Sequence, residues 1–233
     1  MKNFEQPPDQ GREPTPQIKL ENGFQDFPPE EFINDPVGYF EREGKNIKSG
    51  EIKYDEDGGI KEDPTAVKDL PEWHNAQDEQ LHTVGKRVNV EKGEIGKSGD
   101  PFYEYKILET IRDINLPAPR PVAKAEQDET HLIVMERATG IRWWEVKSLR
   151  LKEQGYTDED IKNLQNEAQR KMEELQSQFE EAGITRGWKL KDMVFDIDVE
   201  NKRIVGMTPT DWERTKIDKE RFEVVYEQKQ KHK

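Results

Sequence analysis

Glu-Ala-Gly-Ile-Thr at residues 181–185 ends a long amphipathic segment, and Asp-Trp-Glu at residues 211–213 follows an alternating apolar and polar stretch, residues 203–207. Between them lie a short loop and a second strand-like stretch. The order of elements is therefore helix, loop, two strands and an acidic tripeptide.

The segment resembles the aminoglycoside phosphotransferase and choline-kinase-like family of the protein-kinase-like superfamily, where the corresponding stretch runs roughly AGITHGDLHPDNVLVD…VIDWE. Here residues 182–196 read AGITRGWKLKDMVFD, without a gap. The resemblance implies that Asp211 is the metal-binding aspartate that holds Mg²⁺ against the phosphates of ATP. It also implies a degenerate catalytic loop, because Arg186 replaces the loop histidine, Trp188 the catalytic aspartate and Met193 the metal-binding asparagine.

These replacements remove specific chemistry. The indole of Trp188 can donate one hydrogen bond but cannot accept a proton, and the thioether of Met193 is a poor Mg²⁺ ligand. Two nearby carboxylates, Asp192 and Asp196, could take over the lost role, which keeps an active phosphotransferase open. We instead read residues 196–202 as part of a hairpin whose turn is residues 199–202.

Upstream, residues 84–90 alternate as a strand with one buried face would, and Asp100-Pro101 is typical of a helix start. The resemblance implies that Lys86 is the strand lysine that holds the nucleotide phosphates and that Glu104 is the helix glutamate that orients it. Lys92 is the alternative lysine. The alternative for the pair is an ordinary exposed strand lysine and an exposed helix glutamate.

The rest of the chain extends this pattern. Residues 122–125 and 131–136 are expected strands joined by a turn, and the resemblance implies a hinge at residues 136–140, where Glu136 would lie next to the nucleotide. Residues 141–150 are expected to be helical. A long helix is predicted to start at Thr157 with a capping box to Asp160; its apolar spacing also permits a coiled coil.

Composition restricts the classes of function. Residues 1–80 hold 20 Asp/Glu against 9 Lys/Arg, so the acidity of the chain lies mainly there. A strongly acidic chain argues against a nucleic-acid partner. No apolar run approaches membrane length, and the chain has no cysteine, which fits a reducing, cytoplasmic location. The four histidines show no metal-ligand spacing.

The resemblance implies an α+β fold, a minimal two-lobed protein-kinase-like domain with a truncated helical lobe and an acidic N-terminal extension. Its parts are a disordered or draped extension (1–30), an irregular region with a hairpin (31–80), the small lobe and hinge (81–140), the shortened helical lobe (141–225) and a Lys-rich tail (226–233). The expected function is that of a pseudokinase-type protein that binds ATP and Mg²⁺, transfers phosphate poorly and acts through a protein partner. The alternatives are an active ATP-dependent phosphotransferase and a purely structural interaction domain.

Overall fold

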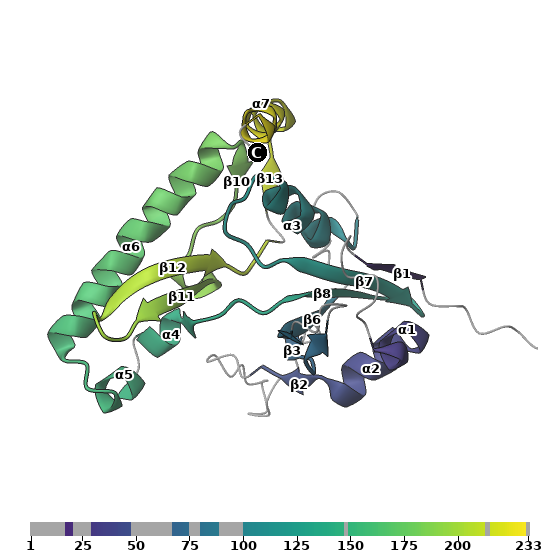
Figure 1. The fold of residues 1–233 in the computed structure, drawn as a ribbon, viewed down its shortest axis with the longest axis horizontal. Helices are drawn as coiled ribbons and strands as arrows, with labels where there is room; N and C mark the ends of the chain where they lie inside the picture. The colour runs from purple at the N-terminus through teal and green to yellow at the C-terminus, as the bar shows by residue number, and fades with distance from the viewer. Residues whose placement is uncertain are drawn as a thin grey trace, which may run out of the picture.

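The computed structural model describes residues 17–20, 29–47, 67–74, 80–88, 100–146, 149–212 and 215–231. They form a mixed structure of helices and antiparallel sheets, compatible with the α+β class. Figure 1 shows one large sheet that includes β7 and β8, and beside it the long helix α6 with the hairpin of β11 and β12. The hairpin expected within residues 31–80, whose strands would fall near residues 51–60, and the alternative lysine Lys92 lie outside the described residues.

The larger sheet consists of antiparallel strands. Their order is β1 (Gln17–Leu20), β7 (Pro121–Gln127), β8 (Thr130–Glu136), β6 (Thr83–Val88), β3 (Val67–Asp69) and β2 (Lys45–Asn46). The predicted turn between β7 and β8 is confirmed: Asp128 and Glu129 have φ values of 47° and 62°. Positive φ at both central residues is what a tight hairpin with the natural strand twist requires.

Helices cover both faces of this sheet. On one face lies α3 (Tyr103–Asp113), which buries Tyr105 and Leu108 in the main core. On the other face α1 (Glu30–Asn34) and α2 (Pro36–Glu43) bury Phe32 and Phe40 in a second core, together with Trp73 of β4 (Trp73–His74), which pairs with β5 (Gln80–Leu81). Side chains alternate along a strand, so β8 supplies both cores.

The second part of the molecule is built around α6 (Asp158–Glu181). The predicted capping box is confirmed, because Thr157 Oγ1 accepts from the backbone N–H of Asp160 and the Asp160 carboxylate accepts from the N–H of Thr157. The apolar stripe of α6 is buried inside this chain, so it does not need a coiled-coil partner. Its buried residues are Ile161, Leu164, Ala168, Met172, Leu175 and Phe179.

Two short sheets pack beside α6. β11 (Met193–Asp198) pairs with β12 (Arg203–Pro209), and the predicted turn at residues 199–202 is confirmed. β9 (Ile141–Arg142) adds to β11 on the other side, and β10 (Ile184–Thr185) pairs with β13 (Lys216–Ile217). The remaining elements are α4 (Trp143–Val146), α5 (Leu149–Glu153), the 3₁₀ turn η1 (Leu190–Asp192) and α7 (Lys219–Gln230).

The structure corrects three expectations. Residues 141–142 form strand β9 rather than the start of a helix. Gln17–Leu20 pair with the edge of β7, so part of the extension is a strand. The helix α7 continues through residues 226–230, where a tail was expected, and Lys229 Nζ donates to the Ile114 carbonyl oxygen at 2.6 Å.

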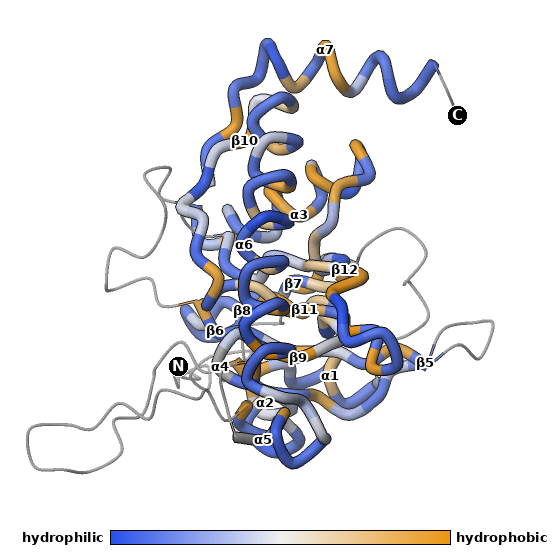
Figure 2. The backbone as a smooth tube through the Cα atoms, turned by 90° about the vertical axis from the view of Figure 1, so that its left-hand side faces the viewer, coloured by the Kyte–Doolittle hydropathy of each residue, from blue (hydrophilic) through white to orange (hydrophobic). Residues whose placement is uncertain are grey.

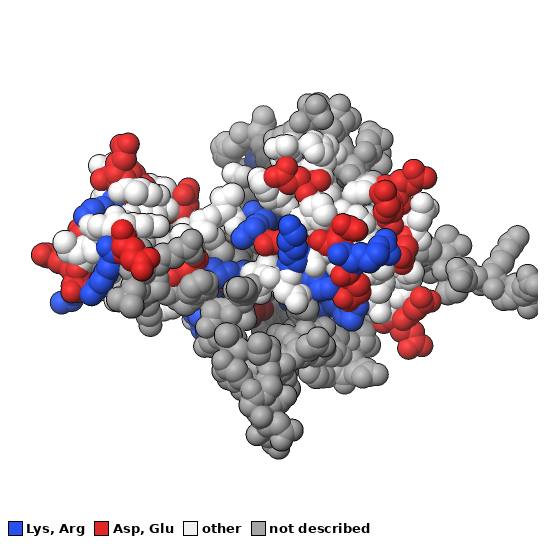
Figure 3. Space-filling view, turned by 90° about the horizontal axis from the view of Figure 1, so that it is seen from below, with Lys and Arg blue, Asp and Glu red and all other residues white. Residues whose placement is uncertain are grey.

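The figures also show where apolar and charged residues lie on these elements. Figure 2 shows α7 as the outermost element at one end, with apolar segments concentrated in the strands of the interior. On the face in Figure 3, the acidic and basic side chains of the described residues are interspersed. None of the described helices combines the length and the apolar character that a bilayer-spanning segment requires.

Candidate functional site

Lys86 and Glu104 meet between the sheet and helix α3. Lys86 lies on β6, Glu104 lies in the first turn of α3, and Lys86 Nζ is 2.6 Å from Glu104 Oε2. The side chains are only 12% and 5% exposed. A charge that is removed from water is tolerated only when it is paired, so each of these residues stabilises the buried position of the other.

Asp192 and Asp211 lie at the same end of the β11–β12 hairpin. Met193 pairs with Pro209, and the next residue, Thr210, donates from its N–H and its hydroxyl to the Asp192 carbonyl oxygen at 2.9 and 3.1 Å. Burial and the nearby charge of Asp211 raise the pKa of Asp192. The hairpin therefore brings two carboxylates close together.

The segment after Asp211 is fixed to helix α3. Trp212 is fully buried, and its indole N–H donates to the Pro209 carbonyl oxygen at 3.1 Å. The hydroxyl of Tyr103 donates to the Thr215 carbonyl oxygen at 2.6 Å. Because Tyr103 precedes Glu104 in α3, this contact ties the helix that carries Glu104 to the segment that carries Asp211.

Arg186 contacts two indole rings and interacts electrostatically with three of these charged residues. Its guanidinium carbon is 4.5 Å from the ring centre of Trp212 and 5.2 Å from that of Trp188. Phe179 of α6 contacts both indoles, with ring centres 5.3 and 5.5 Å away. Burial lowers the pKa of Arg186, and the negative charges of Asp211, Asp192 and Glu104 act in the opposite direction.

Five charged side chains thus share one neighbourhood. We call them the charged cluster: Lys86, Glu104, Arg186, Asp192 and Asp211. Lys86 and Glu104 are the residues expected at the phosphates, and Asp211 is the residue expected at the metal. The cluster also contains Asp192, one of the two replacement carboxylates, and Arg186, at the position of the family's histidine.

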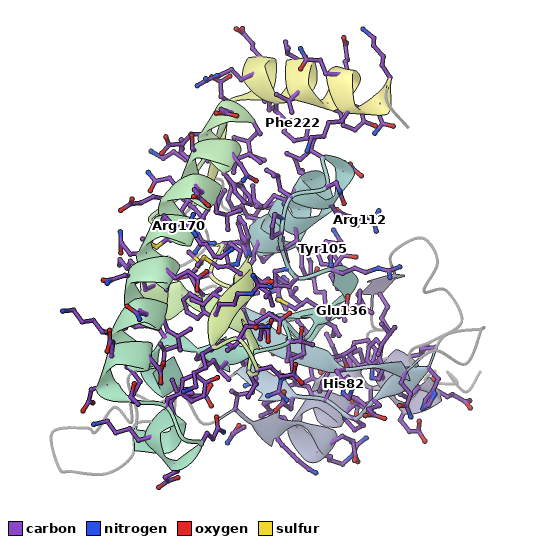
Figure 4. All side chains as sticks on the ribbon, turned by 60° about the vertical axis from the view of Figure 1, so that its left-hand side comes forward. His82, Tyr105, Arg112, Glu136, Arg170 and Phe222 are labelled. Atoms are coloured by element: carbon purple, nitrogen blue, oxygen red, sulfur yellow. The ribbon has the colours of Figure 1, made fainter. Side chains whose placement is uncertain are left out.

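The other candidate residues lie elsewhere. Asp196 is exposed on β11 opposite Gly206, three residues and roughly 10 Å along the strand from Met193, which directly follows Asp192. Glu136 ends β8, and its backbone N–H donates to the Arg120 carbonyl oxygen at 2.8 Å (Figure 4). The strand end is also fixed by Arg137, whose N–H donates to the carbonyl oxygen of His82.

The charged cluster lacks one of the Mg²⁺ ligands that the family resemblance implies. Met193, at the asparagine position, is 1% exposed and belongs to the main core. Within the described part of the chain, no group of three or more His, Cys, Asp or Glu residues could hold a metal ion. Two carboxylates remain, Asp192 and Asp211, but the fixed positive charge of Arg186 already acts on both.

Sequence reasoning missed two features of the site. The hydrogen bond from Tyr103 to Thr215 joins residues that are 112 positions apart, and no local sequence pattern predicts it. The sequence could have indicated part of the stacking of Arg186 on two indoles, because Trp188 is close to Arg186 in the chain and Trp212 directly follows Asp211. Only the packing around Phe179 brings these side chains together.

The chain was compared with protein families, curated sequences and solved structures. No family model and no curated protein sequence matches the chain. Among solved structures, the chain is similar to one described as the crystal structure of Rad53 1-466 in complex with AMP-PNP, with a TM-score of 0.39 and 16% sequence identity. The match covers 74% of this chain and 38% of that chain.

Proposed function

We propose that this chain is a protein-kinase-like protein of the pseudokinase type, in which the charged cluster binds the phosphates of a nucleotide but phosphoryl transfer is impaired. The observation that carries the proposal is the buried ion pair of Lys86 and Glu104. In protein kinases a strand lysine paired with a helix glutamate contacts the nucleotide phosphates. A surface lysine would need no such buried counter-charge.

The arrangement of the elements supports the same proposal. After the strand of Lys86 and the helix of Glu104 come the strands β7 and β8, the connection at residues 137–140 and the long helix α6. The hairpin of β11 and β12 then ends at Asp211. This order matches a small lobe, a hinge and a shortened helical lobe, which is the two-lobed form that we propose for the fold.

The chemistry of the loop favours binding without transfer. The position of the catalytic aspartate is held by Trp188, whose ring contacts Phe179 and Arg186. A general base typically contributes on the order of 10²–10⁴-fold to the rate of a reaction. Because an indole cannot serve as that base, we propose that the chain has a regulatory role and acts through a protein partner.

The test is calorimetric titration of the native chain with ATP in the presence of MgCl₂. We expect the native chain to bind ATP and Lys86→Met to bind it much more weakly. Lys106→Gln is the matched control, because Lys106 lies on α3 in an exposed ion pair with Asp100. Equal affinity in Lys86→Met and the native chain would contradict the proposal.

One observation favours an active phosphotransferase as the second candidate. The pKa of Asp192 is raised, and a base is most effective when its pKa approaches the working pH. Asp192 could therefore replace the missing aspartate, whereas the exposed Asp196 lies too far along β11. ATP turnover that is lost in Asp192→Asn would favour this candidate.

A further inference from the structure

Arg186 carries hydrogen-bond donors that the described residues leave unused. Its Nε and Nη1 are shielded from solvent and have no hydrogen-bond partner in the described part of the chain, and the same is true of Trp188 Nε1. Guanidinium and indole N–H groups are donors only. Buried donors without an acceptor are costly, so the site favours a ligand that brings acceptor oxygens.

Three carboxylates act electrostatically on Arg186. Glu104 is also paired with Lys86, and the negative charges of Asp211 and Asp192 act on the guanidinium. Its flat face is held by the rings of Trp188 and Trp212. The arginine is thus held next to both carboxylates as a fixed positive charge.

We propose that Arg186 supplies, from within the chain, the positive charge that the family obtains from Mg²⁺, so that a nucleoside triphosphate binds at the charged cluster without a divalent metal. This inference rests on the proposed function and adds the chemical form of its ligand. The loss of one metal ligand supports it, because the asparagine position is the buried Met193 and the negative charges of Asp192 and Asp211 act on Arg186.

An arginine suits this role better than the histidine that the family carries there. A histidine is largely neutral at pH 7, whereas an arginine is always charged. The planar guanidinium can also donate two parallel hydrogen bonds to phosphate oxygens.

The test compares ATP titrations of the native chain in EDTA and in excess MgCl₂. We expect the same dissociation constant in both buffers. In EDTA, Arg186→Met should weaken binding by about tenfold or more, since a hydrogen bond to a charged group has roughly that effect on an equilibrium. Arg170→Met is the matched control, because Arg170 lies exposed on α6 and is paired with Glu174 (Figure 4).

A substitution of Asp211 distinguishes a role as metal ligand from an electrostatic effect on Arg186. If Asp211 were a metal ligand, Asp211→Asn would weaken ATP binding in MgCl₂. If Arg186 provides the charge, Asp211→Asn should strengthen binding in EDTA, because it removes a negative charge that acts on the guanidinium. Thermal unfolding of each variant checks that it is folded, and the comparison of the two buffers needs no variant.

The outcomes distinguish this inference from the proposed function. Equal affinity in both buffers, lost in Arg186→Met and retained in Arg170→Met, supports it. Binding that requires MgCl₂ overturns this inference and leaves the proposed function standing. The absence of binding in both buffers overturns both.

Discussion

Lys86 and Glu104 form a buried ion pair with 2.6 Å between Nζ and Oε2, and this contact joins strand β6 to helix α3. The same helix is tied to the Asp211 segment by the hydrogen bond of Tyr103 to Thr215. The position of α3 therefore links the proposed phosphate-binding lysine to the end of the β11–β12 hairpin.

Breaking this pair should destabilise the protein strongly. Glu104→Gln leaves a largely buried ammonium group without its counter-charge, and the loss of one partner of a buried pair typically costs about 3–5 kcal/mol. Lys106→Gln removes an exposed pair on the same helix and should cost less than about 1 kcal/mol. Urea denaturation measures both values, and similar costs for the two variants would show that Lys86 and Glu104 are solvated.

Gly140 should tolerate no side chain. Its φ is +120°, and a Cβ atom there would lie 2.2 Å from the carbonyl oxygen of Phe195. Gly155 has a φ of +84° but nothing within 4 Å of its Cβ position, so Gly155→Ala should cost only the left-handed strain of about 1–2 kcal/mol. We expect Gly140→Ala to lower the melting temperature clearly more than Gly155→Ala does. A smaller effect at Gly140 would mean that the chain does not pass so close to β11.

The carboxyl group of Asp192 should make stability depend on pH. Burial, and then the charge of Asp211, raise its folded-state pKa above 3.8, so its contribution to stability is fully present below that pH and is lost as the pH rises through the folded-state pKa. Asp192→Asn should therefore be more stable than the native chain at neutral pH. This advantage should shrink as the pH falls toward 3.8 in chemical denaturation experiments.

Asp160 provides a control whose pKa is shifted in the opposite direction. Hydrogen bonds from Lys202 and Thr157 lower the pKa of Asp160 to about 2. Its contribution is present above pH 3.8 and is lost as the pH falls through about 2. Asp160→Asn should therefore be less stable than the native chain at neutral pH. If both variants showed the same pH dependence, the account of the Asp192 environment would be wrong.

Local signals were enough to predict much of the helical part. The capping box at Thr157 and the apolar stripe of α6 depend only on neighbouring residues, and so does the turn between β11 and β12. The pairing of Lys86 with Glu104 depended on the family resemblance, because 18 residues separate them and many exposed lysines and glutamates have similar spacing.

The features that the sequence did not predict depend on distant contacts. Gln17–Leu20 form a strand only because the edge of β7 is available, more than a hundred residues away. The helix α7 has no apolar stripe, yet Asp218 at its start is an N-cap signal that accepts from the Arg221 N–H. Phe222 of α7 packs against the main core, as Figure 4 shows.

The most direct test of the central claim measures bound ATP and released phosphate in one sample of the native chain with MgCl₂. We predict that ATP is retained on ultrafiltration by the native chain and by Lys106→Gln but not by Lys86→Met. We also predict that phosphate release stays at the level of buffer alone, because Trp188 cannot act as a general base. Failure of the native chain to retain ATP, or phosphate release that disappears in Asp192→Asn, would contradict the claim that this chain binds a nucleotide without transferring its phosphate.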